Sequence, residues 1–159
     1  MVKAVYPGSF DPITNGHVDI ISRASSIFDA VVVAVYDTPS KSLMFNTNER
    51  VSMCKEAVLG VKNVEVRPYV GLTVTFAKKV NAGVLVRGLR ALSDFESEYA
   101  MALMSKHLAP EIEEVYLMSG LENQYLSSSL LKEVAKLEGD ITELVPNTVA
   151  LALKDKLRN

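Results

Sequence analysis

Short apolar runs alternate along the chain with longer segments in which apolar residues recur at helical spacing. The runs predict strands over residues 2–6, 30–36, 64–68, 84–86 and 114–118. The segments between them predict helices over 18–28, 46–60, 71–83, a long stretch from Ser93 to near His107, 127–139 and 146–157. This alternation predicts the α/β class. We expect one Rossmann-like domain over residues 1–159, with a doubly wound five-stranded parallel sheet.

Two strands carry information about their place in the sheet. The run over 30–36 is β-branched and apolar on both faces, which is typical of a parallel strand covered on both sides. The run over 64–68 alternates in polarity and closes with Pro68, which indicates an edge position.

Helix boundaries and faces are predicted from caps and spacing. Asn46 with Glu49, and Ser93 with Glu96, have the spacing of a capping box, and Pro146 suits a first helical residue. The expected inner faces comprise Leu72, Phe76 and Val80 in one helix, and Leu92, Phe95, Tyr99, Ala102 and Leu103 in the long one.

Composition narrows the class of protein. Hydrophobic residues make up 48% and charged residues 23%, which is globular and not disordered. The net charge of −2 gives no general attraction to nucleic acid or membrane, so an anionic substrate must be held by local positive charge. The single cysteine, Cys54, is expected to be buried and suits a reducing compartment. No signal peptide and no run long enough to span a bilayer are recognised, so we expect a cytoplasmic protein.

The stretch from Tyr6 to His17 is a strand-to-helix turn with two glycines, two prolines and a histidine. Thr14 is the expected N-cap, which places His17 in the first helical turn, where unpaired backbone N–H groups suit a phosphate. The stretch matches neither the G-x-G-x-x-G of dinucleotide binders nor the G-K-[ST] of a P-loop. Plain turn glycines and loop prolines are the alternative interpretation.

Ligands of such sheets bind at the carboxyl ends of the strands. That rule groups the loops over 7–17, 37–44, 87–90 and 119–129, with the segment near 71–73 beside them. Together they supply His17, Lys41, Arg87, Arg90 and three serines, which suits several phosphates. Lys41 is alternatively a solvated loop residue, and the serines alternatively cap a helix. The loops offer no nucleophile with a partnered base, no zinc cluster and no carboxylate cage for magnesium.

Gly-Ser-Phe-Asp-Pro followed by Thr-Asn-Gly-His resembles the first motif of the nucleotidyltransferase superfamily, in the wording of the bacterial phosphopantetheine adenylyltransferases. Arg87-Gly88-Leu89-Arg90 with Asp94-Phe95-Glu96 resembles the second motif of that family. Ser127-Ser128-Ser129-Leu130 resembles the third, and the resemblance runs over nearly the whole chain.

The resemblance implies roles for particular residues. Catalysis is expected from His17, Lys41 and Arg90. ATP is expected to contact Ser9, Phe10, His17, Gly88, Leu89, Arg90, Glu98, Asn123, Gln124, Tyr125, Leu126, Ser127, Ser128 and Ser129. Phosphopantetheine is expected to contact Ser9, Lys41, Thr73 and Arg87.

The activity implied by the resemblance is transfer of AMP from ATP to 4′-phosphopantetheine, giving dephospho-coenzyme A and pyrophosphate by direct in-line attack. Mg²⁺ is expected on the substrate phosphates, with no metal ligand from the chain. The family further implies a homohexamer and feedback inhibition by coenzyme A. Two alternatives stay open: a superfamily member that uses nicotinamide mononucleotide, or a phosphoalcohol with CTP, and a noncatalytic nucleotide-sensing module. A nucleic-acid-binding domain is disfavoured because the chain has no basic stripe.

Overall fold

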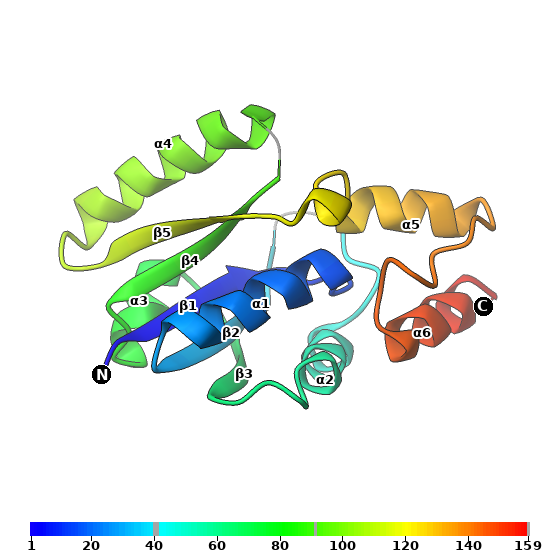
Figure 1. The fold of residues 1–159 in the computed structure, drawn as a ribbon, viewed down its shortest axis with the longest axis horizontal. Coiled ribbons are helices and arrows are strands. Elements are labelled where there is room, and N and C mark those ends of the chain that lie inside the picture. The colour runs from blue at the N-terminus through cyan, green and yellow to red at the C-terminus, as the bar shows by residue number, and fades with distance from the viewer. Residues whose placement is uncertain (40–41, 91, 159) are drawn as a thin grey trace.

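The protein folds around a five-stranded parallel sheet, seen in a computed structural model that describes residues 1–39, 42–90 and 92–158, with the backbone alone at 92–94. The strands are β1 (Lys3–Gly8), β2 (Ala30–Tyr36), β3 (Val64–Tyr69), β4 (Val84–Leu89) and β5 (Glu113–Met118). The helices are α1 (Asn15–Ile27), α2 (Thr47–Ala57), α3 (Thr73–Lys79), α4 (Leu92–Leu108), α5 (Ser128–Lys136) and α6 (Asn147–Arg158), with a 3₁₀ turn at Leu121–Asn123 (Figure 1).

The strand order is β3-β2-β1-β4-β5, and every neighbouring pair is parallel. The predicted α/β class and five-stranded parallel sheet are therefore confirmed, as is the edge position of β3. The chain reverses its direction of winding between β1 and β4, which is where ligands of open α/β sheets bind.

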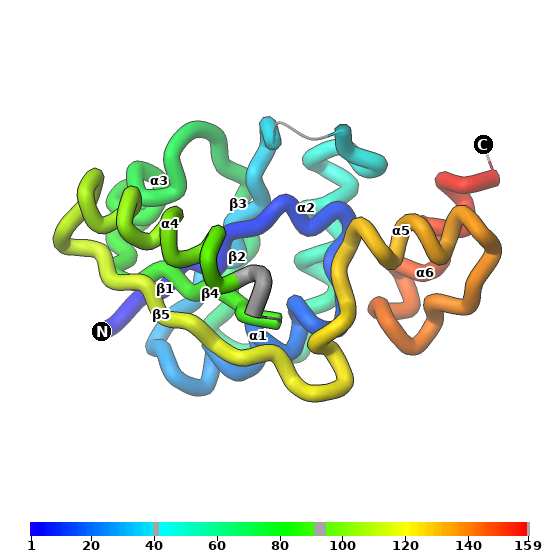
Figure 2. Tube along the Cα trace, turned by 90° about the horizontal axis from the view of Figure 1, so that it is seen from above, coloured from blue at the N-terminus to red at the C-terminus, as the bar shows by residue number. Residues whose placement is uncertain are grey.

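Two apolar clusters cover the two faces of the sheet. On one face Val33 of β2 packs in a cluster with Ile21 of α1, Cys54 of α2 and Leu153 of α6. On the other, Val32 of β2 packs in a cluster with residues of α3, β1 and β4. Successive residues of β2 thus enter opposite cores, as predicted for a strand covered on both sides. Beyond the sheet, α5 and α6 lie together at the end of the molecule that carries the C-terminus (Figure 2).

Two predicted capping arrangements are present. Thr14 caps α1: its hydroxyl accepts from the His17 backbone N–H at 3.4 Å, and His17 Nδ1 accepts from the Thr14 N–H at 3.0 Å. Asn46 and Glu49 form the second capping box, at the start of α2. Both caps satisfy backbone donors that a helix start leaves unpaired.

The predicted inner face of the long helix is wrong. Phe95, Tyr99 and Leu103 are 51%, 55% and 57% exposed, and Ala102 is only half-buried. Apolar spacing predicts a face that avoids water but does not say what covers it, and the described residues place no second layer over α4. The side chain of Leu92, assigned to the same face, lies outside the described part of the chain.

Smaller corrections concern helix starts. Leu72 precedes α3 and is 57% exposed, whereas Phe76 and Val80 are buried as predicted. α4 begins at Leu92, so Ser93 lies inside its first turn and is not its N-cap. Pro146 immediately precedes α6, and its carbonyl accepts from the Ala150 N–H. No helix among the described residues is long and apolar enough to cross a bilayer.

Candidate active site

Two cavities open side by side at the carboxyl ends of β1 and β4. The first has a volume of about 410 Å³ and the second about 470 Å³. Pro7, Gly8, Ser9 and Arg87 line both of them, so the end of β1 and one arginine form a common wall. Two ligands could therefore approach each other across Ser9.

The turn after β1 has a shape that needs its glycine. Phe10 adopts a left-handed backbone conformation with a φ of 47°, and its side chain is buried. A Cβ on Gly8 would lie 2.9 Å from Phe10 Cζ, so no larger residue fits there without movement. The Phe10 ring meets those of Tyr6 and His17 edge-on, with centroid distances of 5.6 and 5.1 Å. This packing fixes the imidazole in the lining of the first cavity.

The hydrogen bond to His17 also decides which ring nitrogen carries a proton. A backbone N–H can only donate, so Nδ1, which accepts from the Thr14 N–H at 3.0 Å, is the unprotonated nitrogen. This assignment leaves Nε2 as the donor of the neutral ring. His17 lines the first cavity, so its imidazole can stabilise an anion there.

Two arginines come from the carboxyl end of β4. The strand runs to Leu89, so Arg87 lies within it and not in the predicted turn over 87–90, and Arg90 directly follows it. Arg87 lines both cavities, and its Nε lies 3.6 Å from Glu98 Oε2 of α4, beyond hydrogen-bonding distance. Both of these atoms are buried and have no hydrogen-bond partner among the described residues. Arg90 lines the first cavity and donates from Nη1 to the Leu126 carbonyl at 3.0 Å, which ties β4 to the loop after β5.

Tyr6 lines the first cavity. Burial raises the pKa of its phenol well above the ordinary value, although Arg90 and Arg87 act in the opposite direction. The hydroxyl therefore stays protonated and cannot serve as a general base.

The three consecutive serines at the start of α5 make different contacts. Ser127 is the N-cap: its hydroxyl accepts from the Leu130 N–H at 3.1 Å. Ser128 Oγ donates to the Pro12 carbonyl at 2.8 Å, which joins α5 to the turn after β1. Ser129 is exposed, and all three line the first cavity. The expectation that one of them caps the helix is confirmed.

The second cavity is lined mainly by apolar and aromatic side chains. Its lining includes three apolar side chains of α4, Met101, Met104 and Leu108, together with Tyr69 and Leu72. The Tyr69 hydroxyl and Thr73 Oγ1 lie 2.9 Å apart, so the tyrosine fixes the threonine side chain. The sequence offered only a core or an interface for the methionines of the long helix. Their place beside a cavity depends on how α4 crosses the sheet, which spacing alone does not give.

A buried ion pair joins the turn after β1 to α5. Asp11 is fully buried and accepts from Lys132 Nζ at 2.5 Å and from the backbone N–H groups of Met44 and Phe45. Burial acts to raise the pKa of the Asp11 carboxyl, but the hydrogen bonds from Lys132, Met44 and Phe45 outweigh it and hold the pKa below the ordinary value. Lys132 was missed in the sequence because a lone lysine on a helix reads as a solvated residue.

Most of the residues singled out from the sequence meet at these two cavities. The first is lined by Ser9, Phe10, His17, Arg87, Gly88, Arg90, Glu98, Asn123, Leu126, Ser127, Ser128 and Ser129. Thr73 lines the second, together with Ser9 and Arg87. Leu89 is buried and lines neither cavity, and Gln124 and Tyr125 are exposed beside the first. Lys41 lies outside the described residues.

Two other expectations concern single residues. Cys54 is fully buried, as predicted, and burial raises the pKa of its thiol to about 12. His107 is exposed in the last turn of α4, as predicted for a surface histidine. Among residues 1–39, 42–90 and 92–158, no three His, Cys, Asp or Glu side chains gather as they would around a metal ion.

The fold and the paired cavities define a nucleotidyltransferase of the cytidylyltransferase-like family, whose family model matches residues 5–134. The fold is shared with a crystal structure from Vibrio parahaemolyticus, assigned as a nicotinate-nucleotide adenylyltransferase. The two have a TM-score of 0.70 and 19% identity, with 97% of this chain and 99% of that chain covered. At that identity the likeness concerns the fold alone.

A much closer relative places the chain within that class. It is 50% identical over 156 residues to the phosphopantetheine adenylyltransferase of Alkaliphilus metalliredigens, with 98% of this chain and 99% of the relative covered. The chain therefore belongs to the phosphopantetheine adenylyltransferase family.

Proposed function

We propose that this protein transfers AMP from ATP to 4′-phosphopantetheine, releasing pyrophosphate and dephospho-coenzyme A. The observation that carries the proposal is the pair of cavities with Ser9 and Arg87 in their common wall. One cavity is lined by hydroxyls, a histidine and arginines, and the other by apolar side chains with an arginine at its mouth. The name of the relative with 50% identity describes the same reaction.

ATP would occupy the first cavity. Arg90 and the hydroxyls of Ser127 to Ser129 surround space suited to a polyphosphate, beside the N-terminal ends of α1 and α5. His17 Nε2 would donate to an oxygen of the α-phosphate or of the leaving pyrophosphate. Asn123 and Leu126 would contact the rest of the nucleotide, and Glu98, Leu89, Gln124 and Tyr125 remain candidates for contacts with it.

Phosphopantetheine would occupy the second cavity. Its arm is slender and largely apolar between amide groups, which suits the side chains of Met101, Met104 and Leu108. Its phosphate would lie near Arg87 and Ser9, at the wall shared with the first cavity. We assign Thr73 to the arm and Lys41 to the phosphate, which the lysine would hold against its repulsion from ATP.

The reaction needs no covalent intermediate. An oxygen of the acceptor phosphate forms a bond to the α-phosphorus of ATP while the bond to the bridging oxygen breaks, and pyrophosphate leaves with that electron pair. A phosphate dianion is already a nucleophile, which agrees with a first cavity whose described lining offers one carboxylate, Glu98, placed beside Arg87. The residues would act by holding the two phosphates in line and by offsetting the negative charge that develops on the leaving group.

Mg²⁺ would bind mainly to substrate phosphates and water. The described lining of the first cavity offers hydroxyls and cationic side chains but only one carboxylate, which fits an ion carried in by ATP better than a resident ion. When bound, Mg²⁺ would neutralise phosphate charge.

Three further properties belong to the same proposal. The exposed apolar side chains of α4, among them Phe95 and Tyr99, support assembly into a homohexamer. Coenzyme A contains the pantetheine arm, so it could compete at the second cavity as a feedback inhibitor. The single reduced cysteine and the absence of a basic stripe in the sequence support a cytoplasmic enzyme without a nucleic-acid partner.

The test is to incubate the protein with ATP, Mg²⁺ and 4′-phosphopantetheine and to measure dephospho-coenzyme A and pyrophosphate. Parallel reactions replace the acceptor with nicotinamide mononucleotide, or use a phosphoalcohol with CTP. Product with phosphopantetheine alone supports the proposal, and a preference for another acceptor would reassign the substrate. Tight ATP binding without pyrophosphate release, whichever acceptor is supplied, would indicate a nucleotide-sensing module instead.

A further inference from the structure

Arg50 is a fully buried arginine of α2 that lines neither cavity. A guanidinium has five N–H donors, and the structure supplies an acceptor for each of them. Nε donates to the Phe45 carbonyl at 3.2 Å, and Nη2 donates to the Asp37 carbonyl at 3.3 Å and to Thr47 Oγ1 at 3.0 Å. Nη1 donates to the carbonyls of Ser9 and Tyr36, both at 2.7 Å. The side chain is thus completely satisfied, as a buried charge must be.

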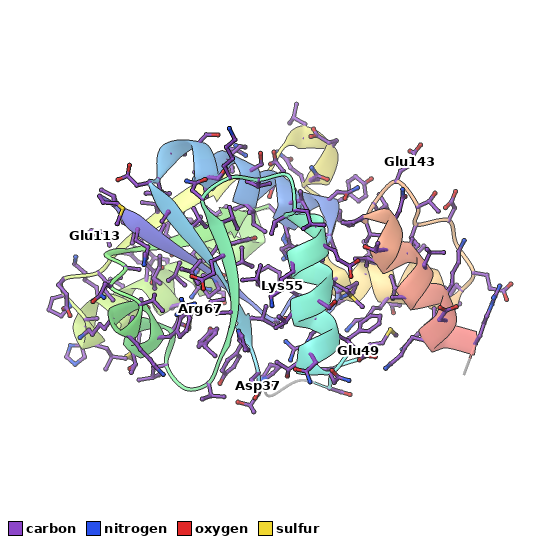
Figure 3. All side chains as sticks on the ribbon, turned by 90° about the horizontal axis from the view of Figure 1, so that it is seen from below. Asp37, Glu49, Lys55, Arg67, Glu113 and Glu143 are labelled. Atoms are coloured by element: carbon purple, nitrogen blue, oxygen red, sulfur yellow. The ribbon has the colours of Figure 1, made fainter. Side chains whose placement is uncertain are left out.

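Its acceptors belong to the segments that form the rim of the site. The Ser9 carbonyl is in the turn after β1, whereas those of Tyr36 and Asp37 are at the end of β2. Figure 3 shows Asp37 at the end of β2, close to the start of α2. Ser9 lines both cavities and Tyr36 lines the second. A single nitrogen, Nη1, therefore links Ser9, in the wall shared by the two cavities, to Tyr36 in the lining of the second.

A second contact strengthens this link. The Thr47 hydroxyl, which accepts from Arg50 Nη2, donates to the Asp37 carboxylate. Asp37 is therefore bound through its backbone to Arg50 and through its side chain to Thr47. Around the guanidinium, the ends of β1 and β2 and the start of α2 are held in one fixed arrangement.

We propose that Arg50 is a positioning residue of the adenylyl-transfer site. It fixes the wall at Ser9 relative to the end of β2, so that the phosphates of the two substrates meet in line. The inference rests on the proposed function, because only a reaction across that wall depends on its position. Lysine cannot replace Arg50, because an ammonium has three donors and cannot match the planar arrangement of acceptors.

A purely stabilising role is the alternative, and the experiment separates the two. Arg50→Lys and Arg50→Met are compared with Met53→Ala, which removes a buried side chain of the same helix that contributes to the core and not to the rim. Each variant is assayed for kcat, for KM of both substrates and for thermal stability. A misplacement of about 1 Å can lower turnover about 10²-fold, so we expect kcat of Arg50→Lys to fall by about that factor. Met53→Ala should lose stability because it leaves a cavity in the core. Its kcat should stay within about threefold of the wild-type value, because Met53 contributes to the core and not to the rim of the site.

A double-mutant cycle with Ser9→Ala asks whether Arg50 acts by positioning the Ser9 hydroxyl, because this variant keeps the backbone carbonyl that Arg50 binds and removes only the hydroxyl. If it does, the fold-loss in kcat caused by Arg50→Lys should be smaller, by a factor of at least about ten, in the Ser9→Ala background than in the wild type. Independent multiplication of the two effects, or a kcat for Arg50→Lys that matches Met53→Ala at equal stability, would overturn the inference.

A readout without substrate completes the test. Amide hydrogen exchange over residues 8–12 and 36–39 should become faster in Arg50→Lys and not in Met53→Ala. Unchanged exchange in Arg50→Lys would contradict the inference whatever the substrates are. Failure of the wild type to form dephospho-coenzyme A would instead remove the proposed function and leave the exchange result to decide whether Arg50 holds the rim.

Discussion

Lys132 Nζ lies 2.5 Å from Asp11 Oδ2, in an ion pair that joins α5 to the turn after β1. The Asp11 side chain is 1% exposed and that of Lys132 is 17% exposed, so water can replace little of this contact. The pair holds two segments that both line the first cavity. Its energetics can be tested by substitution.

Replacing Asp11 with asparagine should destabilise the protein by about 3 kcal/mol, because Lys132 would keep its charge in a mostly buried place without its partner. Lys132→Met should destabilise it by a comparable amount, since the buried Asp11 carboxylate would keep its backbone donors from Met44 and Phe45 but lose its counter-charge. Urea unfolding measures both. The double variant should be less unstable than the sum of the single changes, and simple additivity would show that the pair is not coupled.

The same pair predicts a change in stability with pH. The pKa of Asp11 is lower in the folded protein than its ordinary value of 3.8. The group therefore contributes its full stabilisation above the ordinary pKa and loses it as the pH falls through the lower folded value. The difference in unfolding free energy between wild type and Asp11→Asn should be constant above about pH 5 and shrink below about pH 4. A difference that stays constant down to pH 2 would contradict the assignment.

His17→Ala should lower kcat about 10²-fold to 10³-fold, with a much smaller change in the KM for ATP, because the imidazole is assigned to charge that develops during the reaction. His107→Ala is the matched control: that histidine is exposed in the last turn of α4 and lines neither cavity. Steady-state rates of pyrophosphate release report both. Equal losses in kcat and in ATP affinity for His17→Ala would assign it to ground-state binding.

Tyr69→Phe should raise the KM for phosphopantetheine about threefold to tenfold, since the hydroxyl that fixes Thr73 would be lost while the ring stays. The KM for ATP should not change, because Tyr69 lines only the second cavity. Tyr99→Phe provides a control on an exposed ring of α4 that lines neither cavity. A rise in both KM values would indicate a general loss of structure instead of a local effect.

The fold could be predicted from the sequence because strands and helices differ in the spacing of their apolar residues. The apolar run at Ala30–Tyr36 could be satisfied only between two layers, and Pro68 could be accommodated only at an edge. The same reasoning failed at Phe95, Tyr99 and Leu103, which are apolar, helically spaced and exposed. The spacing of apolar residues predicts which side of a helix is apolar. It does not predict which other element, if any, packs against that side.

The sequence predicted the site residues whose type is rarely found in an ordinary loop or helix start. A histidine after Gly16 in a helix start, and two arginines around Gly88, stand out from ordinary loop composition. Arg50 and Lys132 do not, because charged residues on helices are usually solvated and only burial reveals their partners. Tyr69 and Met104 could not be predicted as site residues for a related reason. In the sequence, an aromatic or apolar residue of a core cannot be distinguished from one that lines a cavity.

The wall at Ser9 and Arg87 has a consequence for inhibitor design. Under the proposed binding mode, a single molecule that joins an adenosine to a pantetheine-like arm through a short polyphosphate would fill both cavities at once. Tethering makes the second half bind at a high effective concentration, so such a hybrid should gain affinity over either half alone by far more than the sum of new contacts suggests. The linker length that gives the highest affinity would also measure the distance between the two subsites.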